Sequence, residues 1–302
     1  MDNGNFKIIS DSCCDLPKKC CEENDIGTVP FYVAFEDGVY KRDTIDFTYH
    51  EFYQKMLDNP GNFPKTSLPD IGEYINAFTP YVKEGRDILC ICMTTTMSGS
   101  YNSAKAAADE ILEEYPDARI EVIDSRALTI FQGMLVMEAV RLRDMGMGLD
   151  ETVAAINSVK ALGGAFFTIG DLTYLNKGGR IGGLVKLAAI GLGIKPVILF
   201  KDGSISLAAI TRSRKKSLSE LARQAALYFT KSGTDIGDYE LLVGYGLNEK
   251  DGEELKTMFI EELSKAGYER DPELVQIGTM VGAHNGPYLM GIAFLKRYSE
   301  GK

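Results

Sequence analysis

The chain has 302 residues, enough for two ordinary domains, and its 45% hydrophobic and 25% charged content is typical of a soluble globular protein. Its net charge of −10 argues against a nucleic-acid partner, whose phosphates require a basic face, and against adsorption to an anionic membrane. No apolar run approaches the roughly 20 residues of a spanning helix, and the N-terminus leads directly into a strand rather than a signal peptide. Composition therefore predicts a cytoplasmic protein without a membrane span.

The first half of the chain alternates between strand and helix patterns. Strands are expected at 6–10 and 28–35, from residue 88, and at 119–123. Helices are expected to begin near 15–17 and at 65–70, and to cover 49–57 and 128–145; a further helix follows the strand at 88 and runs through Leu112. Thr66 or Ser67 is the expected N-cap of the helix after 65–70. Repeated strand–turn–helix units predict a doubly wound, mostly parallel α/β sheet.

Polar residues follow three of the expected strands, at Asp11-Ser12, Thr94 to Ser98 and Asp124-Ser125. In a doubly wound sheet, ligands bind beyond the carboxyl ends of the strands, so these residues are expected at one edge. The segment 94–100 combines hydroxyl side chains with the expected start of a helix, where unpaired N–H groups attract anions. Because it adds donors without positive charge, it suits a carboxylate or an esterified acid better than a triphosphate.

The second half follows a different pattern and begins after a glycine bend at Gly163-Gly164. Strands are expected at 165–169, 195–200 and 239–245, a hairpin at Asp202-Gly203, and closing strands at 274–279 and 291–294. Helices are expected at 217–229 and 251–265. This pattern predicts an α+β domain, so the chain is divided at Leu162 into domains 1–162 and 163–302.

The cysteines do not form a recognisable metal or disulfide pattern. Cys13-Cys14 and Cys20-Cys21 are adjacent pairs, whose side chains diverge, and they lack the spacing and second half of a structural zinc site. We therefore expect no metal centre and no disulfide framework.

Three further motifs leave alternatives open. Ser98 lies in a turn that superficially resembles a nucleophile elbow, but Thr96 occupies the first glycine position of that motif, and only His50 and His284 could act as base. The segment 177–183 is either a flexible connector or places Arg180 near the mouth of an interdomain cleft. The basic cluster 211–216, with Arg212 and Arg214, is either a solvated helix lead-in or a docking site for an acidic partner.

Together these segments resemble the DegV family of bacterial fatty-acid-binding carriers over nearly the whole chain. The landmarks, in family order, are 10–12 with 15–17, 65–67 with Pro69, 97–104, 122–125, 172–175 with 177–181, and 282–287. The resemblance implies a long-chain fatty acid buried between two domains, with no other cofactor. It also implies that Thr66 and Ser98 hydrogen-bond the carboxylate, and that His284, Arg212 and Arg214 handle the head group or contact a kinase.

The kinase implied by the resemblance is similar to dihydroxyacetone kinases and phosphorylates the bound acid to an acyl phosphate. The apolar segment 184–192 and parts of Phe166-Phe167 are the expected tunnel walls. The leading hypothesis is therefore a non-catalytic carrier. The alternatives are a hydrolase or small-molecule kinase that uses Ser98 and His284, and a signalling module switched by bound lipid.

Overall fold

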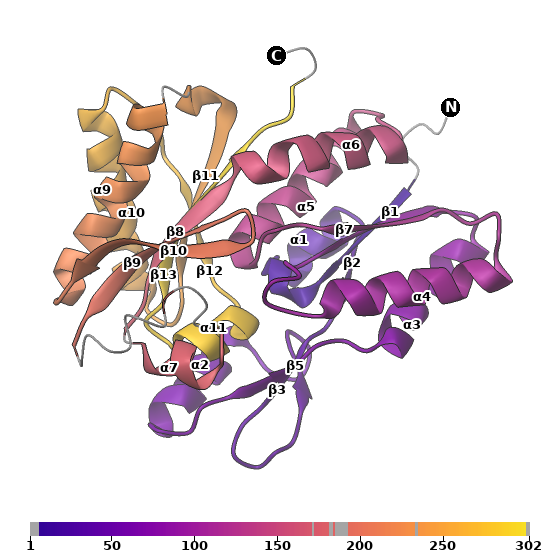
Figure 1. Cartoon of the computed structure of the whole chain (residues 1–302), viewed down its shortest axis with the longest axis horizontal. Coiled ribbons are helices and arrows are strands. Elements are labelled where there is room, and N and C mark those ends of the chain that lie inside the picture. Colours follow the sequence, from indigo (N-terminus) through magenta and orange to yellow (C-terminus); the bar gives the residue numbers. More distant parts are fainter. Residues whose placement is uncertain (1–5, 171, 181–183, 185–192, 233–234, 300–302) are drawn as a thin grey trace.

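The computed structural model describes residues 6–170, 172–180, 184, 193–232 and 235–299 (Figure 1). Its elements up to residue 162 are β1 (Phe6–Asp11), α1 (Lys18–Glu23), β2 (Ile26–Val29), β3 (Tyr32–Ala34), β4 (Lys41–Arg42), α2 (Tyr49–Asp58), β5 (Lys65–Ser67), α3 (Ile71–Lys83), β6 (Asp87–Cys92), α4 (Ser100–Glu114), β7 (Ile120–Asp124), α5 (Thr129–Asp144) and α6 (Leu149–Val159), with short 3-10 turns at Ser12–Cys14 and Lys160–Leu162. The later elements are β8 (Gly164–Thr168), α7 (Thr173–Lys177), β9 (Lys195–Lys201), β10 (Ser204–Thr211), α9 (Arg214–Ser232), β11 (Tyr239–Tyr245), α10 (Glu249–Lys265), β12 (Glu273–Gln276), α11 (Thr279–Asn285) and β13 (Met290–Lys296), with a 3-10 turn at Ile236–Asp238.

The first sheet is parallel throughout and has the strand order β2-β1-β6-β7. Its strands are apolar on both faces because helices cover both sides. Ile9, Ile88 and Cys90 pack against α3 and α4, while Phe6, Ile8 and Leu89 face α5 on the other side. The predicted doubly wound parallel sheet is confirmed.

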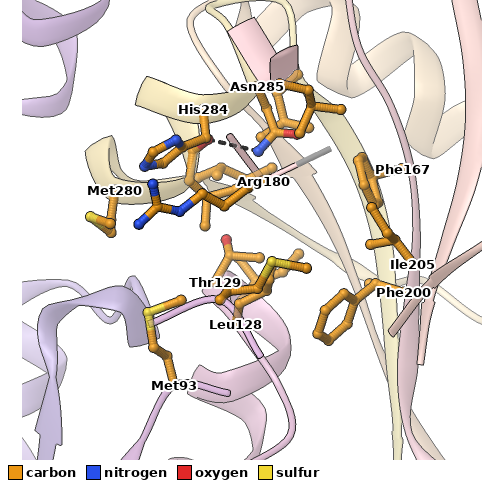
Figure 2. Close-up of a pocket in the computed structure, with 18 of the residues that line it drawn as sticks. Met93, Leu128, Thr129, Phe167, Arg180, Phe200, Ile205, Met280, His284 and Asn285 are labelled. Atoms are coloured by element: carbon orange, nitrogen blue, oxygen red, sulfur yellow. Dashed lines mark hydrogen bonds between the residues drawn. The ribbon is translucent and has the colours of Figure 1, made fainter. Parts of the chain in front are cut away.

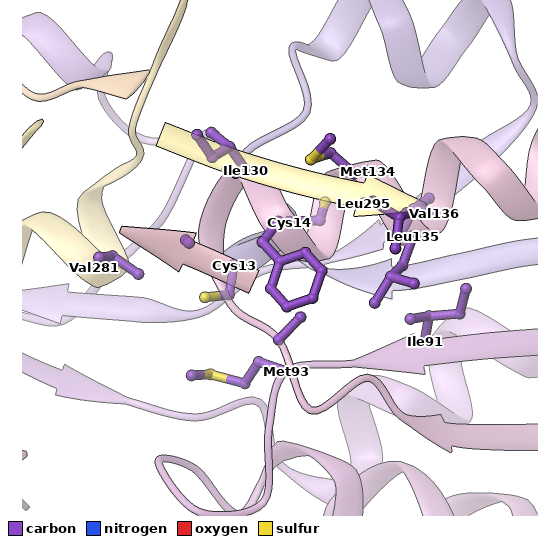
Figure 3. Close-up of a cluster of buried hydrophobic side chains, with 14 of the residues drawn as sticks. Cys13, Cys14, Ile91, Met93, Ile130, Met134, Leu135, Val136, Val281 and Leu295 are labelled. Carbon is purple, nitrogen blue, oxygen red and sulfur yellow. The ribbon is translucent and has the colours of Figure 1, made fainter. Parts of the chain in front are cut away.

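Helix α5 lies between the two large sheets and is buried along most of its length. It contacts β1 of the first sheet and both β11 and β13 of the second. A helix that is apolar on all sides belongs in a protein interior. Figure 3 shows the resulting core, in which Met134 and Leu135 of α5, Ile91 of β6 and Leu295 of β13 are among the labelled side chains.

The second large sheet has the order β10-β9-β8-β13-β11-β12 and is antiparallel except for the β11–β12 pair. Helices α9 and α10 cover its outer face, where Phe229 and Phe259 pack with Phe294. The other face is directed toward α5. The expected α+β architecture of the second half is confirmed, whereas the division into domains at Leu162 stays a prediction.

A small antiparallel sheet, β4-β3-β5, corrects two expectations. The single strand expected at 28–35 is two strands in different sheets, because Pro30 interrupts it and the next amide donates to the Ser12 hydroxyl. The expected cap at Thr66 or Ser67 is wrong, since both residues belong to β5. Helix α3 instead begins with a capping box in which the Asp70 side chain accepts from Glu73 N.

Three boundaries in the second half also differ from expectation. The helix expected from Ser217 begins at Arg214, inside the basic cluster, and the closing strand expected at 274–279 ends at Gln276. His284, expected in a turn, lies in helix α11. Among the residues described, no helix combines the length and the apolar character needed to cross a membrane.

Candidate functional site

A cavity lies between α5 and the inner face of the six-stranded sheet (Figure 2). Figure 2 shows Arg180 beside the His284 ring, with Phe167, Phe200 and Ile205 across the cavity from them. The remaining described walls are almost entirely apolar and come from the segments that carry Met93, Met97, Leu128, Ile130, Ala165, Leu175, Ile277, Met280, Val281, Leu289 and Ile292. The cavity therefore suits a ligand that is apolar over most of its length and polar at one end.

His284 and Thr66 are brought together although they are far apart in the chain. His284 Nε2 lies 2.9 Å from Thr66 Oγ1, which β5 positions by pairing Thr66 with Val33 of β3. The histidine is 8% exposed, and burial, reinforced by the positive charge of Arg180, lowers its pKa to about 4. The ring is therefore neutral at physiological pH, and one nitrogen donates while the other accepts.

The described part of the glycine-rich segment, residues 177–180, packs against this histidine. A Cβ added to Gly178, which ends α7, would lie 2.2 Å from His284 Nδ1. Gly179 then turns the chain with a φ of +69°, a conformation that favours glycine. Arg180 Nη1 donates to the Gly178 carbonyl at 2.8 Å, and Arg180 lines the cavity. Residues 181–183 lie outside the described part of the chain, as does 185–192 of the expected tunnel wall.

Ser98 lies in the loop between β6 and α4, next to the cavity-lining Met97. Its N–H donates to the Thr94 carbonyl at 3.2 Å, and its Oγ accepts from Ser100 N at 3.2 Å. Leu68, which follows β5, lies over this loop, because its Cδ2 is 3.3 Å from the Cβ position of Gly99. The segments that carry Thr66 and Ser98 are thus adjacent. Among the described residues, no hydrogen bond joins Ser98 to Thr66 or to His284.

The β9–β10 hairpin closes one side of the cavity. Phe200 and Ile205 of this hairpin line the cavity. At its tip, Gly203 N donates to the Arg126 carbonyl at 3.1 Å, and the Gly203 carbonyl accepts from Thr96 Oγ1 at 2.5 Å. The six-stranded sheet is therefore attached to the loops at the carboxyl edge of the parallel sheet, where ligands of doubly wound folds bind.

The basic cluster lies away from this cavity. The Arg214 guanidinium donates to Asp251 Oδ2 at 3.1 Å and to the Tyr288 carbonyl at 2.8 Å, so it ties α9 to α10 and to the segment before β13. Arg212 is exposed. Neither arginine lines the cavity.

Cys13 and Cys14 are buried in the core that Figure 3 shows. Burial raises the pKa of both thiols well above the usual range, which keeps them protonated and makes them poor metal ligands. In the described ranges, no group of three or more His, Cys, Asp and Glu side chains could hold a metal ion.

Thr129 and Asn285 are polar residues of the cavity that the sequence analysis did not single out. Thr129, the first residue of α5, donates a hydrogen bond to Asp15 and has a φ of +52°, which is strained for a β-branched side chain. No sequence signal marks that strain. Asn285 was detectable, because it follows His284 within the motif 282–287, and its side chain donates to the Val281 carbonyl at 2.8 Å.

The sequence matches the DegV family model over residues 5–297, nearly the whole chain. The chain belongs to the DegV family. A DegV domain-containing protein of Clostridium perfringens is 32% identical over 96% of this chain and 97% of its own length.

Solved DegV structures share the fold. A protein from Eubacterium ventriosum, described as stearic-acid-binding, is 39% identical with a TM-score of 0.91, covering 97% of this chain and 99% of its own. A DegV family protein from Thermus thermophilus, whose structure is described in terms of fatty acid binding, is 25% identical with a TM-score of 0.84 and the same two coverages.

Proposed function

We propose that this protein binds a long-chain fatty acid in the cavity, with the carboxylate held by Thr66 and Ser98 beside His284. The observation that carries this proposal is an apolar cavity lined at one end by the buried His284, whose ring is hydrogen-bonded to the half-buried Thr66. The DegV proteins from Eubacterium ventriosum and Thermus thermophilus, described as binding fatty acids, support it. We also propose that residues 1–162 and 163–302 are separate domains, the first supplying Thr66 and Ser98 and the second His284.

The energetics of such a ligand match the composition of the cavity. Burying about 12 methylenes at roughly 0.8 kcal/mol each contributes on the order of 10 kcal/mol, before the costs of association. A head group buried without partners would cost several kcal/mol, so the hydroxyls of Thr66 and Ser98 are needed as donors. The guanidinium of Arg180 supplies the complementary charge at the same end of the cavity.

The proposal further includes a cytoplasmic kinase, similar to dihydroxyacetone kinases, that phosphorylates the presented carboxylate while this chain catalyses no step. The exposed members of the basic cluster, Arg212, Lys215 and Lys216, are the proposed contact for an acidic surface of that kinase. Arg214, tied to Asp251, would fix the segment that presents them.

Two observations favour a carrier over a hydrolase that uses Ser98 and His284. The ring of His284 is hydrogen-bonded to Thr66 rather than to Ser98. Its pKa of about 4 is also too low for an efficient general base near neutral pH.

Native mass spectrometry of the purified protein, followed by organic extraction, tests the binding proposal. We expect a stoichiometric fatty-acid adduct, and a loss of roughly 1–3 kcal/mol in affinity for palmitate in Thr66→Val and in Ser98→Ala. A protein that stays free of lipid when palmitate is added, or a double variant with unchanged affinity, would contradict the site assignment.

The kinase step needs a separate experiment with the partner kinase, ATP and hydroxylamine to trap acyl phosphate. We expect Arg212→Glu to slow trapping without weakening palmitate binding. Arg223→Glu, a charge reversal within α9 and outside the basic cluster, is the matched control and leaves the rate unchanged. If both variants slow acyl-phosphate trapping equally, the proposal that the basic cluster contacts the kinase is contradicted.

A further inference from the structure

The end of β1 carries three consecutive polar residues, Ser10, Asp11 and Ser12, that are almost completely buried. None of them lines the cavity, and the proposed carboxylate site does not use them. Burying such groups is costly unless each is hydrogen-bonded. Asp11 bonds both ends of the loop that carries Ser98, and Ser12 is linked through Asp43 to the helix that carries His284.

Asp11 joins the two ends of the Ser98 loop. Its Oδ2 accepts from Met93 N at 2.9 Å, just after β6, and from Ser100 Oγ at 2.8 Å, where α4 begins. Its Oδ1 accepts from Gln132 Nε2 of α5 at 2.9 Å. Ser100 Oγ also lies 2.6 Å from the Tyr74 hydroxyl. Because Ser100 donates its only hydroxyl proton to Asp11, Tyr74 is the donor in this second hydrogen bond. A single carboxylate thus sets both ends of the loop that carries Ser98.

Asp43, just after β4, makes the corresponding link to the helix that carries His284. Its Oδ1 accepts from Thr279 Oγ1, the first residue of α11, at 2.5 Å. Its Oδ2 accepts from Ser12 Oγ at 2.9 Å. Ser12 Oγ in turn accepts from Phe31 N at 3.0 Å, so its one proton goes to Asp43. Helix α11 is therefore anchored at the same end of β1 as the Ser98 loop.

We propose that Asp11 and Asp43 are positioning residues that hold the Ser98 hydroxyl and His284 in the geometry that recognises a carboxylate. Neither carboxylate contacts the ligand itself. Asp11 acts by holding the Ser98 loop, and Asp43 acts by holding helix α11. This inference rests on the proposed fatty-acid site. It adds two groups, both outside the cavity, on which head-group recognition depends.

In the hydrogen bonds described for Asp11 and Asp43, the carboxylate oxygens are the acceptors throughout. At Asp11, a change to Asn places an NH₂ group against the N–H of Met93 or of Gln132; at Asp43 it places one against a hydroxyl that now donates, which has to turn its proton away. Neither change alters the volume appreciably. Such a change leaves the apolar cavity walls in place and displaces the loop or the helix. We therefore expect the carboxylate contacts to weaken while the acyl-chain contacts persist.

The experiment measures head-group discrimination, defined as the ratio of the dissociation constants of methyl palmitate and palmitate. Titrations at pH 8 keep Asp43 ionised, because burial raises its pKa to about 6. Wild type, Asp11→Asn and Asp43→Asn are compared with Glu138→Gln. Glu138 is the matched control because it is also a buried, hydrogen-bonded carboxylate, but it bonds Arg141 and Tyr298 N. Ser100→Ala removes the hydrogen bonds of Ser100 with Asp11 and Tyr74, and Thr279→Val removes the hydrogen bond to Asp43; both serve if an Asn variant does not fold.

We expect discrimination to fall by about tenfold in each Asn variant and in the two milder variants, and to be unchanged in Glu138→Gln. In a Ser98→Ala background, Asp11→Asn should lower it by less than about twofold, because both changes remove the same contact. Equal weakening of palmitate and methyl palmitate, or full additivity with Ser98→Ala, would overturn the positioning role alone. A wild-type protein that does not discriminate would overturn the proposed function as well.

Discussion

Replacing Gly178 by alanine should disturb the candidate site through a single steric contact. The new Cβ would lie 2.2 Å from His284 Nδ1 and 3.1 Å from the Tyr174 carbonyl oxygen. Ordinary contact requires roughly 3.5 Å, so the ring has to move by more than about 1 Å. Gly178 itself has a φ of −75°, which alanine adopts freely, so the backbone adds no strain.

That movement breaks the 2.9 Å hydrogen bond between His284 and Thr66 and leaves buried polar atoms unpaired. The expected loss of unfolding free energy is about 2–4 kcal/mol, combining overpacking with the lost hydrogen bond. Urea denaturation at pH 7 measures this loss, and a palmitate titration measures the accompanying loss of affinity.

Gly179→Ala is the matched control for this prediction. Gly179 has open space around its Cβ position but a φ of +69°, so alanine there costs only the backbone strain of about 1 kcal/mol. If Gly178→Ala proves no more destabilising than Gly179→Ala, and binds palmitate as well as wild type, the close packing against His284 is refuted.

Three further predictions concern stability. Burial raises the pKa of Asp15 to about 8, so the stability that its protonated form provides below the unfolded pKa of about 4 is lost as the pH rises toward 8. Asp15→Asn should therefore flatten the dependence of the unfolding free energy on pH, measured by urea unfolding. The lowered pKa of His284 acts in reverse: stability present above pH 6.5 is lost as the pH falls toward 4, and His284→Gln should resist mild acid better than wild type. Phe229→Ala should cost about 3–5 kcal/mol on denaturation yet leave palmitate affinity unchanged, because Phe229 of α9 packs on the outer face of the sheet, away from the cavity.

Local signals were sufficient for most of the architecture. The strand-then-polar pattern at Asp11 and Asp124 correctly located the carboxyl edge of the parallel sheet, because strand burial and the following turn are encoded within a few neighbouring residues. The sequence analysis expects the N-cap at Thr66 or Ser67, although the sequence also contains the Asp70–Glu73 capping box. Two competing cap signals lay a few residues apart, and only the pairing of β5 with β3 decides between them.

The candidate site could be predicted only in part from the sequence. Thr66 and His284 are 218 positions apart, and their contact depends on how the small sheet packs against α11. No local pattern encodes such a contact, so the roles of both residues at the head group came from the family resemblance. The ion pair of Arg214 with Asp251 is similarly non-local, and a run of basic residues gives no indication that one member is held by another helix.

The pairing of Thr66 with His284 also has a consequence for synthesis of the protein. Thr66 leaves the ribosome long before His284, since 218 residues separate them. A nascent chain that has folded only its parallel sheet and the small sheet that carries Thr66 therefore has one half of the head-group site and no closed cavity. Under the proposed function, lipid can bind only after both ends of the chain have met, and the bound fatty acid then stabilises the finished protein by mass action. Lipid occupancy would thus report that a molecule has completed folding.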